Sequence, residues 1–150
     1  MKLQILQAIA FLGGVCLAIQ AGFNAQLGTI LKKSILASIS TAIASALFGL
    51  LFLLLFFAKD IPGSQVIRQV PWYLWLVGGL FSVVGITAYY FTIPRLGIAK
   101  MISLGLCGQL IFSMIAGHFG WLNLPANPIT LKKIIGVVTM AAGIILINSK

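Results

Sequence analysis

The sequence predicts an all-α integral membrane protein with five transmembrane helices, arranged as one domain over residues 1–150. Of its 150 residues, 61% are hydrophobic and 7% are charged, and only one is acidic. Apolar runs of about 20 residues are long enough to cross a hydrocarbon core of roughly 30 Å as α-helix. The runs lack the alternation of polar and apolar residues that is typical of barrel strands, so helices are favoured.

The five expected helices are approximately 3–31, 35–57, 72–92, 97–117 and 131–147. The first is too long for the apolar region of a signal peptide, and no cleavage site follows it at a suitable distance, so we expect it to be retained. Trp72 opens the third helix and Trp121 follows the fourth, as expected of interfacial anchors. All five prolines are expected between helices, where a missing N–H costs least.

Basic residues divide equally between the two sides of the membrane. The side of the N-terminus holds Lys2, Lys59, Arg68, Lys132 and Lys133, and the opposite side holds Lys32, Lys33, Arg95, Lys100 and Lys150. An excess of Lys and Arg in cytoplasmic loops orients membrane proteins. Five basic residues on each side therefore predict that the chain inserts in both orientations. The alternative is a fixed topology set by the first helix or by a partner.

An odd number of spans combined with this charge tie predicts half of a ten-helix inverted-repeat transporter. The second half would be another copy of the chain in the opposite orientation, or a homologous partner chain. The net charge of +9 is scattered over several connections and two membrane faces, so we expect membrane lipids as partners and no nucleic acid.

Polar residues within the spans are the candidates for substrate binding, because hydrocarbon penalises them unless they line a cavity or a helix contact. Gln20 and Asn24 share one face of the first helix, one turn apart, and either a cavity or interhelical contact explains them. Tyr89 lies on the face of Ser82, whereas Tyr90 points elsewhere. The predicted substrate-binding residues are Gln20, Asn24, Ser82, Tyr89, Gln109 and Phe112.

Three further residues are candidates for a second layer or a gate. They are His118, Arg95 and Tyr90. For His118 the alternative is an interfacial residue hydrogen-bonded to a loop, and for Arg95 it is a side chain that reaches the lipid headgroups. Small residues spaced four apart in the second helix, from Ser34 onward, favour helix packing over a site.

The sequence offers no catalytic constellation. Cys16 and Cys107 have no second cysteine or histidine at ligand spacing, so we expect no metal and no disulfide. No phosphate-binding loop, dinucleotide motif or nucleophile–base pair is present, so we expect neither an enzyme nor a cofactor. The sole acid, Asp60, lies outside the spans. A proton-coupled cation exporter built around a buried carboxylate is therefore disfavoured.

Several segments resemble the YdcZ-like family, the five-helix branch of the drug/metabolite transporter superfamily. They are QAGFNAQLG at 20–28, PWYLWLVGG at 71–79, IPRLG at 93–97, CGQL at 107–110 and HFGWLNLP at 118–125. The resemblance implies a multi-pass protein of the bacterial inner membrane, whose relatives occur as single dual-topology chains, opposed pairs or fused ten-helix chains. Many relatives have an acidic residue before the histidine; here Gly117 replaces it, which argues against a carboxylate–imidazole role for His118.

Together these features predict a secondary transporter that exports an unknown small molecule, a metabolite or drug. It would act as an antiparallel homodimer by alternating access, around a midplane cavity. A flippase for lipids or lipid-linked precursors would use the same scaffold, and a dual-topology channel is a further alternative.

Overall fold

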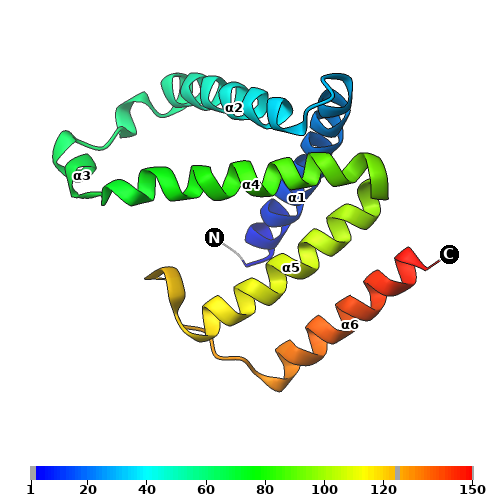
Figure 1. Ribbon diagram of the computed structural model, residues 1–150. Coiled ribbons are helices and arrows are strands. Elements are labelled where there is room, and N and C mark those ends of the chain that lie inside the picture. The colour runs from blue at the N-terminus through cyan, green and yellow to red at the C-terminus, as the bar shows by residue number, and fades with distance from the viewer. Residues whose placement is uncertain (1–2, 124–125, 150) are drawn as a thin grey trace. The chain divides into compact units, whose positions relative to one another are not determined.

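The computed structural model describes residues 3–123 and 126–149. Within these ranges the chain is all-helical, without a strand, and has five helices that are long and apolar enough to cross a membrane. They are α1 (Leu3–Ile30), α2 (Ser34–Phe56), α4 (Trp72–Leu96), α5 (Ile98–His118) and α6 (Leu131–Asn148) (Figure 1). Shorter elements in the connections are η1 (Ala58–Asp60), α3 (Ser64–Gln69) and η2 (Trp121–Asn123). The five predicted spans are thus confirmed.

One predicted boundary is wrong, because α4 continues past Thr92 to Leu96 and contains Pro94. Pro94 has no N–H, so the carbonyl of Tyr90 loses its helical partner, but in the last turn that costs only one hydrogen bond. Continuing the helix keeps the other backbone groups paired, which hydrocarbon favours. The helix ends at Gly97, whose φ of 83° is readily available to glycine.

The chain forms two compact units, Met1–Arg95 and Leu96–Lys150. In the first unit, α1 and α2 are joined by a tight turn and pack against each other near it. Gly28 makes this approach possible: a Cβ there would lie 3.3 Å from the Cα of Ser34 and 3.5 Å from the Cβ of Ala37. Ala25 and Ala37 are buried at the same contact. Ser34 and Ala37, at the start of α2, therefore pack against α1.

In the second unit, α5 and α6 lie side by side. Met101, Ala116 and Ile144 of these two helices are buried. At one end, the amide nitrogen of Asn148 donates to the hydroxyl of Ser103 over 3.2 Å. At the other end, the connection between the helices folds back onto α5, where Asn127 N donates to the carbonyl of Gly117 over 2.7 Å.

Candidate functional site

A polar pocket of about 300 Å³ lies between α1 and α2 in the first unit. Its lining residues are Gln20, Asn24, Ser40, Thr41, Ala44, Ser45 and Phe48. Five of these seven side chains are polar and none is charged, in a chain that is 61% hydrophobic. The two helices therefore concentrate neutral hydrogen-bonding groups at one place. Gln20 and Asn24, which the sequence placed on one face, do line the same pocket.

The pocket lies well inside the apolar span. Gln20 is ten residues before Ile30, the last residue of α1. At 1.5 Å per residue this is about 15 Å along the helix, or half of a hydrocarbon core of roughly 30 Å. Ser45 is eleven residues into α2, at a comparable distance from the turn. Gln20 and Ser45 thus lie near the depth at which hydrocarbon penalises polar groups most, whereas Asn24, six residues before Ile30, lies about 9 Å from that end of α1.

Tyr90 connects α4 to this pocket. Its hydroxyl accepts a hydrogen bond from Gln20 Nε2 over 3.4 Å and lies 3.3 Å from Thr41 Oγ1. Thr41 in turn donates to the carbonyl of Ala37 over 2.8 Å. Tyr90 is only 2% exposed, and Thr41 is buried as well. Tyr90, predicted as a residue of a second layer or a gate, lies directly behind the pocket and contacts two lining residues, Gln20 and Thr41.

A second contact joins α2 to α4 beside the first. The hydroxyls of Ser38 and Thr87 lie 2.7 Å apart, and Ser38 is buried. Because Ser38 also donates to the carbonyl of Ser34, Thr87 is the donor to Ser38. Two neutral hydrogen-bonded contacts, one helical turn apart on each helix, therefore hold α2 and α4 together. Thr87, Thr41 and Ser38 were not among the predicted site residues.

Asn24 differs from its neighbours in the pocket. It is half-buried, and within the described part of the chain its carboxamide neither donates nor accepts a hydrogen bond. A carboxamide offers two donors and an acceptor, and leaving them unpaired in hydrocarbon is costly. The pocket therefore presents an unsatisfied polar group to whatever occupies it.

The remaining candidates on α4 lie outside the lining of this pocket. Ser82 is exposed, and Tyr89 is half-buried. Arg95, near the end of the helix, folds back along it: its guanidinium lies 3.6 Å from the ring centroid of Phe91 and donates to that residue's carbonyl. This contact holds the Arg95 side chain against the surface of its own helix.

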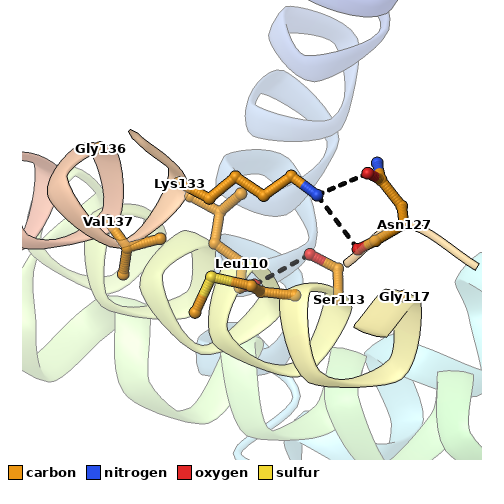
Figure 2. Close-up of a pocket in the computed structure, with 8 residues that line it drawn as sticks. Leu110, Ser113, Gly117, Asn127, Lys133, Gly136 and Val137 are labelled. Atoms are coloured by element: carbon orange, nitrogen blue, oxygen red, sulfur yellow. Dashed lines mark hydrogen bonds between the residues drawn. The ribbon is translucent and has the colours of Figure 1, made fainter. Parts of the chain in front are cut away.

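A groove of about 340 Å³ lies between α5 and α6 in the second unit (Figure 2). It is lined by Leu110, Ser113, Met114, Gly117, Asn127, Lys133, Gly136 and Val137. The ammonium of Lys133 donates to Asn127 Oδ1 over 2.6 Å, to Asn127 O over 3.1 Å and to Pro128 O over 2.7 Å. Since an ammonium has three hydrogens, these bonds use all the donors of Lys133, and they hold the connection between α5 and α6 against the start of α6.

The predicted residues of the second unit are not gathered into this groove. Gln109 and Phe112 are exposed on α5, outside its lining. His118 Nδ1 accepts a hydrogen bond from Ile129 N over 3.2 Å, and its ring meets Phe119 edge-on. This hydrogen bond is the loop contact that the alternative interpretation of His118 expects.

Five apolar helices and a neutral polar pocket at mid-span are features of a multi-pass membrane transporter. The model of the family described as "Putative inner membrane exporter, YdcZ" matches residues 5–146. The chain belongs to this family and is a multi-pass protein of the inner membrane. No curated protein and no solved structure gives a significant match.

Proposed function

We propose that the chain exports a small solute by alternating access as an antiparallel homodimer, with the pocket between α1 and α2 as its cargo site. The observation that carries the proposal is Asn24, a carboxamide that has no hydrogen-bond partner among the described residues and lies within an apolar span, about 9 Å along α1 from its end. A cavity that alternately admits water and cargo supplies the partners that hydrocarbon cannot.

The pocket is lined from α1 and α2 alone, so one chain supplies only part of a wall. Both helices also expose large apolar side chains along their length, including Phe11, Leu47 and Phe52. These surfaces are covered either by lipid or by another protein. A second copy would close the pocket, and it would add a symmetry-related set of polar groups to the same cavity.

The distribution of charge supports an opposed arrangement of the two copies. The basic residues that the structure describes lie in the connections or at helix ends. This agrees with the assignment of five Lys and Arg residues to each side of the membrane, which assumes that they lie outside the spans. Lys32 and Lys33 form the turn after α1, whereas Lys59 and Arg68 lie between α2 and α4. Lys2 and Lys150 lie outside the described residues. Copies inserted in both orientations can pair about an axis in the membrane plane, which gives two equivalent states, one open to each side.

Variants with opposite charge bias test this proposal. Ser64→Lys with Gln69→Lys raises the count on the side of the N-terminus from five to seven. Lys59→Gln with Arg68→Gln lowers it to three in the same exposed connection. Each double variant should insert in one orientation and lose export, measured as saturable counterflow of small radiolabelled solutes in proteoliposomes.

Coexpression of the two double variants should restore both export and copurification through different affinity tags. Full activity of either double variant alone would contradict the antiparallel pair. If the two double variants copurify normally but show no saturable counterflow, the result would contradict the proposed export. It would still agree with the antiparallel pair.

The groove of the second unit favours one alternative, a lipid flippase. Its lining includes Leu110, Met114 and Val137, and the positive charge of Lys133 lies at one end. An acyl chain and an anionic headgroup would match this arrangement. Protein-dependent loss of headgroup asymmetry in vesicles that carry labelled lipid would support the flippase over the solute exporter.

A further inference from the structure

The hydrogen bonds behind the pocket have only one possible direction. The Ala37 carbonyl can only accept, so the single hydroxyl hydrogen of Thr41 is used there. Thr41 Oγ1 must therefore accept from the hydroxyl of Tyr90, which uses the only hydrogen of that group. Tyr90 Oη is then left with acceptor capacity alone, and Gln20 must present its NH₂ group to it.

This chain of bonds fixes which way round the Gln20 carboxamide lies. The two arms of a planar amide diverge, so with Nε2 directed to Tyr90 the carbonyl Oε1 occupies the other arm. Tyr90 is not a lining residue, whereas Gln20 is. The arm that faces away from Tyr90 is thus the one available to the pocket, and it is an acceptor.

From this geometry we propose that the pocket selects neutral solutes that carry an N–H or O–H donor, and that Tyr90 is the residue that sets this selectivity. The inference rests on the proposed function only in treating the pocket as the cargo site. Asn24, one turn from Gln20, adds a second carbonyl oxygen and an NH₂ group to the same lining. Because no lining residue is charged, nothing there compensates a charged cargo for its lost hydration.

Phe48 adds an aromatic face to the lining, which suits a solute with a flat apolar part. Benzamide combines such a ring with an NH₂ donor, and N,N-dimethylbenzamide keeps the ring and the carbonyl but has no donor. Binding of the two compounds to the purified full-length protein can be compared by ligand-observed NMR, with empty micelles as the baseline. The ratio of the two dissociation constants reports donor selectivity and is insensitive to how much protein is folded.

For the unaltered protein we expect benzamide to bind roughly threefold to tenfold more tightly, the worth of one neutral hydrogen bond. Tyr90→Phe removes the acceptor that holds Nε2, so the Gln20 amide can turn over and the ratio should fall to within about twofold. Tyr73→Phe is the matched control, since Tyr73 lies exposed at the start of the same helix, and it should keep the ratio. Gln20→Leu should weaken benzamide binding, whereas Gln26→Leu, an exposed glutamine of α1, should not.

Equal binding of the two compounds by the unaltered protein would overturn the inference, and so would binding of neither. If Tyr90→Phe left the ratio of the two dissociation constants unchanged, Tyr90 would not be the residue that sets the donor selectivity. These failures are distinct from failure of the exporter, because restoration of counterflow by the oppositely biased variants requires no particular cargo chemistry.

Discussion

The hydroxyl of Tyr90 in α4 lies 3.3 Å from the hydroxyl of Thr41 in α2, and both residues are buried. Through this contact a helix that does not line the pocket orients a group that does, because Tyr90 also bonds Gln20. A movement of α4 relative to α2 would therefore alter the polar lining as well as the packing. In an alternating-access transporter, such coupling links helix motion to the affinity for cargo.

Asn24→Leu tests whether the carboxamide serves cargo or helix contact. Leucine keeps the helix apolar but removes both the donors and the acceptor, so saturable counterflow should fall at least about tenfold while the dimer persists. Gln26→Leu, an exposed position on α1, should leave transport unchanged. Dissociation of the dimer by Asn24→Leu, seen by crosslinking in native membranes, would show that this residue holds helices together instead.

Gly28→Val tests the close approach of α1 and α2. The added Cβ would lie 3.3 Å from the backbone of Ser34, so the helices must separate. Overpacking of this kind costs about 1–3 kcal/mol in the free energy of unfolding. Gly14→Val is the matched control on α1, because a Cβ there meets nothing within 4 Å in the structure. Reversible unfolding in mixed micelles measures both, and equal stability of the two variants would contradict the packing.

Lys133→Met tests the fastening of the connection to α6. The variant loses hydrogen bonds to Asn127 and Pro128 that are partly exposed, so we expect a loss of about 1 kcal/mol and faster amide exchange around Asn127. Lys132→Met removes the same charge from the same side of the membrane, and Lys132 is exposed. In Lys132→Met the amide exchange around Asn127 should stay normal. Equally fast exchange in the two variants would show that the lost charge, and not the loss of the Lys133 hydrogen bonds, is responsible.

The sequence predicted the five helices well because each apolar run must hydrogen-bond its own backbone in hydrocarbon. The helix end predicted at Thr92 is wrong because Pro94 was expected between helices, although in the last turn of a helix a proline removes only one hydrogen bond. Helix existence follows from composition, whereas helix ends depend on local caps, such as Gly97 with its positive φ.

The residues of the candidate site were predictable only within one helix. The spacing of Gln20 and Asn24 places them on a common face whatever α1 packs against. The choice between Tyr89 and Tyr90 depends on how α4 is rotated against α2, which no periodicity in a single sequence determines. Thr41 was not among the predicted site residues, because its contact with Tyr90 depends on a residue 49 positions further along the chain.

Orientation in the native membrane is the central claim, and single-cysteine labelling measures it most directly. Cysteine is placed at Ser64, between α2 and α4, or at Ser149, after α6, in a Cys16→Ala and Cys107→Ala background. An impermeant maleimide is applied to intact spheroplasts and then after permeabilisation. The account predicts that about half of the molecules react from outside at either position. Complete reaction at one position with none at the other would contradict it, because every chain would then face the same way.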